Sequence, residues 1–344
     1  MVDCLSKLLT STGKEERLGF LQSVAETIDK KTSPAARAYA EVEVARVKLD
    51  TGNLDDVRKD LDDVERALDM LDSVDNIVNA AFYDVNADYY NVSFVPDKIN
   101  TLIGVLIFPQ RKEDFAAYYR NALLYLACVD INAMTPEERR SRAWRLAIAA
   151  LVSNSIYNFG ELLLHPILDA LSPITSTSTS TPSIAQTAAA RTSQDDDAWL
   201  RELLFAFNRG DLPSYDALVD RIAAHGVLGQ HQQHLAQKIH LSCLTEAVFR
   251  RPTHERAMTF SDLSAETRIR PEEIEHLLMK ALSLGLVRGT IDQVDAVAHI
   301  TWVQPKVLDM AQIESMRQRL LDWDSTVNQL GHWIESAGQD VWAA

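Results

Sequence analysis

Apolar residues recur along most of this chain with the three- and four-residue spacing of amphipathic α-helices. The clearest early case follows Gly52 and Asn53, where one continuous apolar stripe consists of Val57, Leu61, Val64, Leu68 and Leu71. Gly52 can end the preceding helix in a left-handed conformation, and Asn53 can cap the next helix. The pattern therefore predicts a helical hairpin over 34–71.

The same punctuation recurs at Gly210 and Asp211, within LLFAFNRGDLPSYDALVDRI. Two such stops favour stacked αα-hairpins, although two unrelated helical turns remain an alternative. Further helical patterns cover 114–129 and 139–168, and the second begins after the capping sequence TPEE. We therefore predict a mainly α protein that opens with a tetratricopeptide-like helical repeat array over 1–171.

Two segments depart from the helical pattern. Residues 172–197 are rich in Ser, Thr, Ala and Pro and end in an acidic run, so we predict a flexible insertion there. Residues 92–110, VSFVPDKINTLIGVLIFPQ, are β-prone and form a possible insertion. Because Val-Ser can be encoded by GTAAGT and Gln by CAG, which are typical intron ends, we hypothesise that this segment is a retained intron.

The pattern changes again near Arg251. Residues 259–268 resemble a short capped helix, and a second helix begins at Pro271 and ends at Gly285. The alternating stretches LVRGTID and AHITWV then predict two strands joined by a turn. We therefore predict a winged helix over 251–305, preceded by a helical part over 198–250.

The last segment, 306–344, predicts a helix with a regular apolar seam. Its apolar residues are spaced as heptad a and d positions and are Ile313, Met316, Leu320, Trp323, Val327, Leu330 and Ile334. These seven residues are our candidate partner-binding site. The alternative is that the helix folds back on the chain's own winged helix.

A winged helix raises the possibility of nucleic-acid binding, but the charges disfavour it. The second helix opens with Glu272, Glu273 and Glu275, where a major-groove reader usually offers Arg, Asn, Gln or Lys. Residues 251–300 contain six Lys or Arg against eight Asp or Glu, and the whole chain has a net charge of −15. Such a surface lacks the attraction to phosphates that nucleic-acid binding requires.

Motifs for catalysis or cofactor binding are absent from the sequence, including phosphate-binding glycine loops and nucleophile elbows. His231 and His234 share a helix face and could hold a metal, but no nearby carboxylate or thiolate completes the site. We expect no enzyme activity, cofactor, metal, membrane span or small-molecule substrate. Three scattered cysteines and the lack of a signal peptide favour the cytoplasm and nucleus.

Four stretches carry a specific resemblance to a known family: SIYNFGELLLHPIL, WLRELLFAFNRGDL, FSDLSAETRIRPEEIEHLLMKALSLGLVRGTIDQVD and HITWVQPKVLDMAQI. They lie within 155–313 and resemble the 26S proteasome non-ATPase regulatory subunit 13 family, whose members carry a PCI domain. Weaker similarity extends back to LDTGNLDDVRKDLDDVE and FYDVNADYY. Relative to this family, 92–110 and much of 172–197 look like insertions, and the chain looks as though it begins late.

The resemblance implies a non-catalytic scaffold subunit of the proteasome lid that serves ubiquitin-dependent protein degradation. In that family the winged helices of PCI subunits pack side by side, and the terminal helices gather in a bundle. The implied partners are therefore other PCI subunits, bound through the winged helix and the terminal helix. Alternatives are a PCI scaffold of the COP9 signalosome or of the translation initiation factor three complex and, more distantly, a winged-helix nucleic-acid binder.

Overall fold

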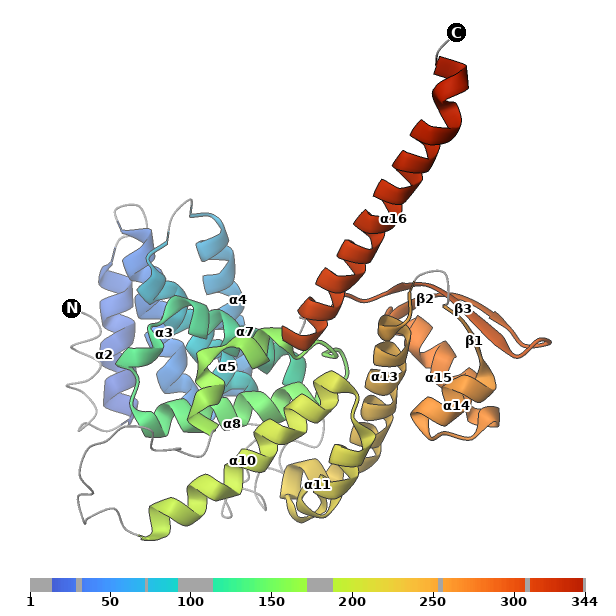
Figure 1. The fold of residues 1–344 in the computed structure, drawn as a ribbon. Helices are drawn as coiled ribbons and strands as arrows, with labels where there is room; N and C mark the ends of the chain where they lie inside the picture. Colours follow the sequence, from blue (N-terminus) through green and yellow to red (C-terminus); the bar gives the residue numbers. More distant parts are fainter. Residues whose placement is uncertain are drawn as a thin grey trace, which may run out of the picture.

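The structure, a computed structural model, describes residues 14–28, 33–71, 74–91, 114–171, 188–252, 256–306 and 310–342. Nearly all of these residues are helical, and a small sheet lies near the C-terminal end. Figure 1 shows the N-terminal helices on one side of the molecule and the sheet on the other, with the last helix projecting away from both. The mainly α prediction is confirmed.

The first helices form an antiparallel array held by its own small cores. They are α2 (Lys14–Thr27), α3 (Pro34–Thr51), α4 (Leu54–Asp69) and α5 (Asn76–Asn91). In the predicted stripe of α4, Val57, Leu61 and Val64 are buried against α3 and α5. Gly52 ends α3 in the left-handed conformation, as predicted. Asn53 stands at the N-cap position of α4, but its side chain makes no capping hydrogen bond.

The next group contains α7 (Phe115–Cys128), η2 (Ile131–Ala133), α8 (Pro136–Val152), α9 (Gly160–Leu164) and η3 (Pro166–Leu171). Thr135 caps α8 by accepting a hydrogen bond from the Glu138 amide, as the TPEE sequence predicts. The helical pattern predicted over 139–168 is confirmed for most of its length, but it forms separate helices, because α8 ends at Val152 and the chain turns before α9.

The third group consists of α10 (Ala188–Arg209), α11 (Leu212–Ala224), α12 (Gly226–Gln230) and α13 (Gln232–Arg250). Gly210 ends α10 with φ 65°, so this second hairpin stop is also confirmed. The flexible insertion predicted over 172–197 is wrong for its last ten residues, which belong to α10. Three alanines at 188–190 favour helix strongly, and α10 continues into the buried residues Trp199 and Leu200. Residues 172–187 lie outside the described part of the chain.

A buried lysine fixes α13 to the end of α8. Lys238 is fully buried, and its Nζ donates hydrogen bonds to the carbonyl oxygens of Ala150 (2.8 Å), Leu151 (3.0 Å) and Ser153 (2.8 Å). Burial lowers the pKa of Lys238 well below its ordinary value. Three carbonyl acceptors nevertheless require three N–H donors, which only the ammonium form supplies. The lysine therefore satisfies the carbonyl groups that the end of α8 leaves without helical partners.

Helix α13 joins two hydrophobic cores. Leu235 and Ile239 belong to a large core that includes residues from α5 and from α7 to α13, whereas Leu241, Leu244 and Val248 belong to the core of the winged helix. The first of these cores contains residues from both sides of the predicted boundary at 171–198. The described residues on the two sides of that boundary therefore share one packed interior.

The winged helix consists of β1 (Ala257–Thr259), α14 (Phe260–Thr267), α15 (Pro271–Ser283), β2 (Val287–Asp292) and β3 (Val297–Val303). Both predicted helices and both predicted strands are confirmed. The strands are antiparallel in the order β1-β3-β2, and β1 was not predicted. At the bulge in β2, Gly289 lies so close to the backbone of His299 that a Cβ would not fit.

The terminal helix α16 (Met310–Trp342) follows the winged helix. In Figure 1 it leaves the rest of the molecule as a single extended helix. Among the described residues, no helix is both long and apolar enough to cross a membrane. The possible insertion at 92–110 lies outside the described residues.

Candidate assembly interface

The predicted partner-binding seam on α16 is exposed along its whole length. The exposed fractions are 46% for Ile313, 42% for Met316, 62% for Leu320, 67% for Trp323, 44% for Val327, 55% for Leu330 and 48% for Ile334. Helix α16 therefore does not fold back on its own winged helix, and that alternative is wrong. Leu321 and Trp333, which are not part of the seam, are also exposed, at 48% and 65%.

Such an arrangement is costly for a helix that stands alone in water. Soluble proteins expose single apolar side chains without consequence, but a continuous apolar strip usually marks a surface that another protein covers. The seam covers 22 residues, which corresponds to roughly 33 Å of helix. Its apolar residues repeat in the heptad pattern by which one helix packs against another. The geometry of α16 therefore suits helix–helix association.

Sequence reasoning placed the seven seam residues on one helix face but missed Leu321 and Trp333. Both lie off the a and d positions, so the heptad search passes over them. The sequence nevertheless contains a signal for them. A helix that packs on one side alone usually carries polar residues outside its apolar face, so an apolar residue at such a position is unusual. Trp333 flanks the seam and widens its apolar surface, whereas Leu321 lies toward the other side of the helix.

Helix α16 touches the winged-helix region near its first turns. Arg319 Nη2 donates a hydrogen bond of 2.8 Å to the backbone oxygen of Arg250, the last residue of α13. The polar neighbours of the seam interact within the helix itself, since Arg317 pairs with Glu314 and Asn328 Nδ2 donates to Asp324 Oδ2 at 3.2 Å. The charged residues thus leave the apolar strip open.

The winged helix presents an acidic helix end and two sheet edges. Glu272 and Glu273 are exposed at the start of α15, and Arg270 is held by an ion pair with Glu273. The buried face of α15 consists of Ile274, Leu278 and Ala281. Because β1 and β2 form the two edges of the sheet, their outer backbone groups are placed for pairing with another strand.

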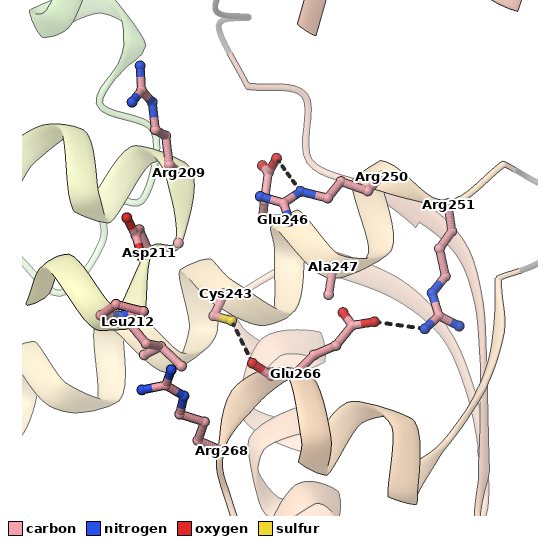
Figure 2. A pocket seen from close by; sticks show the side chains of 12 residues that line it. Arg209, Asp211, Leu212, Cys243, Glu246, Ala247, Arg250, Arg251, Glu266 and Arg268 are labelled. Atoms are coloured by element: carbon pink, nitrogen blue, oxygen red, sulfur yellow. Dashed lines mark hydrogen bonds and ion pairs between the residues drawn. The ribbon is translucent and has the colours of Figure 1, made fainter. Parts of the chain in front are cut away.

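A cavity of about 520 Å³ lies where the helical part meets the winged helix. Figure 2 shows that its lining comes from the turn between α10 and α11, from the end of α13 and from the end of α14. Four arginines and three acidic residues are among the lining residues: Arg209, Arg250, Arg251, Arg268, Asp211, Glu246 and Glu266. The cavity is therefore charged but close to neutral.

Four charged groups of this cavity are paired with one another. Arg251 pairs with Glu266 at 2.8 Å, and Arg250 pairs with Glu246 at 3.3 Å. Cys243 Sγ donates to the backbone oxygen of Glu266 at 3.4 Å, and burial raises the pKa of its thiol. A protonated thiol is a poor nucleophile. The arrangement therefore fits a junction between two packed units rather than a reaction centre.

The structure shows what surrounds His231 and His234, the pair that could share a metal according to the sequence. The ring of His231 packs edge-on against Phe115, with 5.9 Å between ring centres. Burial lowers the pKa of His234, with a further contribution from the nearby Lys238. Across the described ranges, no group of three or more His, Cys, Asp or Glu side chains is arranged to hold a metal ion.

Comparison with known proteins shows the family to which this chain belongs. Three family profiles match the chain: PSD13 N-terminal repeats at residues 1–94 and 106–179, the PCI domain at 220–302 and the Rpn9 C-terminal helix at 306–338. A 26S proteasome regulatory subunit rpn9 from Schizosaccharomyces pombe, described as probable, is 34% identical over 97% of this chain and 77% of that protein. The chain belongs to the PSD13/Rpn9 family of 26S proteasome regulatory subunits.

Other members of the family match a smaller part. The 26S proteasome regulatory subunit RPN9 of Saccharomyces cerevisiae is 37% identical over 67% of this chain and 54% of its own length. The 26S proteasome non-ATPase regulatory subunit 13 of Dictyostelium discoideum is 38% identical over 62% of this chain and 51% of its own length. In these two relatives, the chain spans about half of the protein.

The comparisons also bear on four expectations. Family membership confirms the resemblance and the expectation of a non-catalytic protein, because family members are named regulatory and non-ATPase subunits. The match to the PSD13 N-terminal repeats omits residues 95–105, inside the possible insertion at 92–110. The Rpn9 C-terminal helix profile covers every seam residue from Ile313 to Ile334.

Proposed function

We propose that this chain is a non-catalytic scaffold subunit of the lid of the 26S proteasome regulatory particle. In this role it supports ubiquitin-dependent protein degradation by binding other PCI-domain subunits. The observation that carries the proposal is the apolar seam of α16, which is exposed in the chain and lies within the match to the Rpn9 C-terminal helix. As a lid subunit, the chain would occur in the cytoplasm and nucleus.

The contacts would be of two kinds. The seam of α16 supplies apolar area for packing in a bundle with helices of other subunits. The sheet edges β1 and β2 supply backbone groups that pair with the winged helix of a neighbouring PCI subunit. Neither contact requires a catalytic group, a metal or a cofactor.

A second candidate, a PCI scaffold of the translation initiation machinery, has less support. The eukaryotic translation initiation factor 3 subunit M of Aspergillus oryzae is 26% identical over 54% of this chain and 37% of its own length. The match of residues 306–338 to the Rpn9 C-terminal helix favours the proteasome lid instead.

Removal of the chain after Gln304 tests the proposal. The shortened protein keeps all of the described cores, so we expect it to stay soluble and folded but to be absent from affinity-purified lid particles on native gels. Normal co-purification of the shortened protein with the particle would contradict the role of α16. If the full-length chain itself is absent from purified particles, the proposed lid membership is wrong.

Paired substitutions separate the seam from the helix as a whole. Leu320→Asp together with Leu330→Asp places two charges on the seam, and we expect incorporation into the lid to fall by at least about 100-fold. The matched control, Gln318→Asp with Ser325→Asp, adds the same charges on the opposite face and should leave incorporation unchanged. Equal losses in both variants would show that charge alone disrupts assembly.

A further inference from the structure

Two cations from the C-terminal part of the chain contact the ends of α10 and α13. Lys306, which follows β3, donates from Nζ to the backbone oxygen of Asn208 at 3.4 Å. Arg319 of α16 donates from Nη2 to the backbone oxygen of Arg250 at 2.8 Å. Both oxygens belong to the last turn of a helix, where carbonyl groups lack an intrahelical partner and carry partial negative charge. Each cation therefore satisfies a helix end in a distant part of the chain.

The contact through Lys306 is nearly buried. The side chain of Lys306 is 12% exposed, and its Nζ also lies 3.8 Å from Oε2 of Glu246, a buried residue of α13. Burial lowers the pKa of Lys306, and the Glu246 carboxylate opposes that shift. Polar groups that are paired inside a protein stabilise a single arrangement. Lys306 therefore holds the segment that leaves the winged helix against α10 and α13.

The two cations contact α13 within one helical turn. Glu246 and Arg250 are four residues apart, and Figure 2 shows the ion pair of 3.3 Å that joins them. Lys306 lies before residues 307–309, which are outside the described part of the chain, and Arg319 lies nine residues after the start of α16. The contact through Arg319 is thus roughly 14 Å along the helix from its first residue. A second contact at that distance restricts the tilt of α16.

The contact through Arg319 leaves the seam open. Arg319 directly precedes Leu320 of the seam, yet the side chain of Leu320 is 62% exposed. Figure 1 shows α16 leaving the body as a single extended helix beyond its first turns. Arg317, the other arginine of α16, pairs with Glu314 of the same helix. Arg319 therefore connects α16 to α13 without covering the apolar strip.

We propose that Lys306 and Arg319 are positioning residues that hold α16 in a fixed direction relative to α13 in the free chain. The seam then reaches other subunits already oriented, so less orientational freedom is lost when it binds. This inference deepens the proposed function, on which its effect on assembly rests. The direction of α16 in the free chain does not depend on that function.

Pulsed electron paramagnetic resonance on the full-length chain tests this direction. Spin labels at Asp220 on α11 and Gln329 on α16, two exposed positions, are attached through introduced keto amino acids so that the native cysteines stay. The wild-type chain should give one narrow distance distribution. Arg319→Ala removes one hydrogen bond, so the ratio of the oriented helix to all other orientations should fall about fivefold and the distribution should broaden. Arg319→Lys keeps a donor and should restore the narrow distribution.

The matched control is Arg317→Ala, which removes the same charge from the same helix and should leave the distribution narrow. Arg319 is exposed and belongs to none of the described hydrophobic cores, so Arg319→Ala should also leave the urea midpoint unchanged. Adding Lys306→Met to Arg319→Ala should broaden the distribution further. A distribution that is already broad in the wild-type chain, or that stays narrow in Arg319→Ala, would overturn the proposal.

Competition between tagged variants and the wild-type chain for purified lid particles tests the effect on assembly. Incorporation of Arg319→Ala should fall by up to about fivefold, because a smaller fraction of the chain presents the seam in the binding direction. Incorporation of Arg317→Ala should match the wild-type chain. Equal incorporation of Arg319→Ala and Arg317→Ala would show that the direction of α16 does not serve assembly. If the wild-type chain never enters the lid, the proposed function is wrong, and the distance measurements still decide whether Arg319 orients α16.

Discussion

Helices α13 and α16 both carry apolar residues at helical spacing, but these residues are buried in α13 and exposed in α16. In α13, Leu235, Ile239 and Leu244 are fully buried, whereas in α16 the exposed fractions of Leu320, Trp323 and Leu330 lie between 55% and 67%. The spacing of apolar residues determines which side of a helix is covered but not which molecule covers it. The apolar residues of α13 are covered by other parts of the chain. Those of α16 are exposed, so only a second molecule could cover them.

The two helices also differ in where their polar side chains lie and what these side chains contact. On α13 the buried Lys238 donates to three carbonyl groups at the end of α8 and so connects two units of the same chain. On α16 the charged residues lie beside the seam and are exposed. A polar group buried inside the chain stabilises a single arrangement, while exposed charges beside an apolar strip select a partner.

A Leu to Asp substitution should have the largest effect on stability in α13 and almost none in α16. Leu244→Asp would bury a carboxylate in the winged-helix core, and we expect the winged helix to unfold because such burial costs more than about 5 kcal/mol. Leu320→Asp adds a charge to an exposed position and should change the free energy of unfolding by less than about 0.5 kcal/mol. Circular dichroism during urea titration measures both. Comparable destabilisation by the two variants would show that the chain itself covers the α16 seam.

Lys238 gives the next largest effect. Lys238→Ala leaves three carbonyl groups unpaired and creates a void, and we expect it to lower the free energy of unfolding by about 3 kcal/mol. Lys238→Met fills most of the space without donating hydrogen bonds, so it should recover part of that loss. Urea midpoints of the two variants separate the contribution of the hydrogen bonds from that of the packing. Wild-type stability of both would mean that the lysine does not hold α8 to α13.

A smaller effect should appear as a dependence on pH. Burial lowers the pKa of His225, of His234 and of His240, so these side chains are neutral in the folded chain and bind protons more readily when it unfolds. Their contribution to stability is present above the unfolded pKa of about 6.5 and is lost as the pH falls through the lower folded values. The urea midpoint should therefore fall between about pH 7.5 and about pH 5.5.

The variant His234→Gln provides the control, because it should reduce this difference. The chain that ends at Gln304 sharpens the comparison between the helices. Since all three histidines belong to α13 or its N-terminal neighbours, this shortened chain should keep the same pH dependence. A pH dependence that disappears with α16 would contradict the assignment.

Sequence reasoning succeeded where the determining interactions are local. Thr259 caps α14, Pro271 begins α15 and Gly285 follows its end with φ 70°, and each of these is a signal within a few residues of the boundary that it sets. The hairpin stops at Gly52 and Gly210 belong to the same class. The winged helix and the hairpins were therefore predictable from the sequence.

Elements that depend on distant contacts were missed. Strand β1 has three residues and exists because it pairs with β3, about forty residues later in the chain. The end of α8 at Val152 is stabilised by Lys238, more than eighty residues away. In the candidate interface, the positions of the seven seam residues were predictable, but their exposure was not, because a helix buried by its own chain carries the same period.

The central claim is that the seam of α16 is covered by other subunits in the lid and not by its own globular part. Hydrogen–deuterium exchange tests this most directly when the amides of 313–334 are followed in the free chain and in purified lid particles. The free chain should exchange these amides rapidly, and the assembled particle should protect them strongly. Strong protection already present in the free chain, or rapid exchange that persists in the particle, would contradict the account.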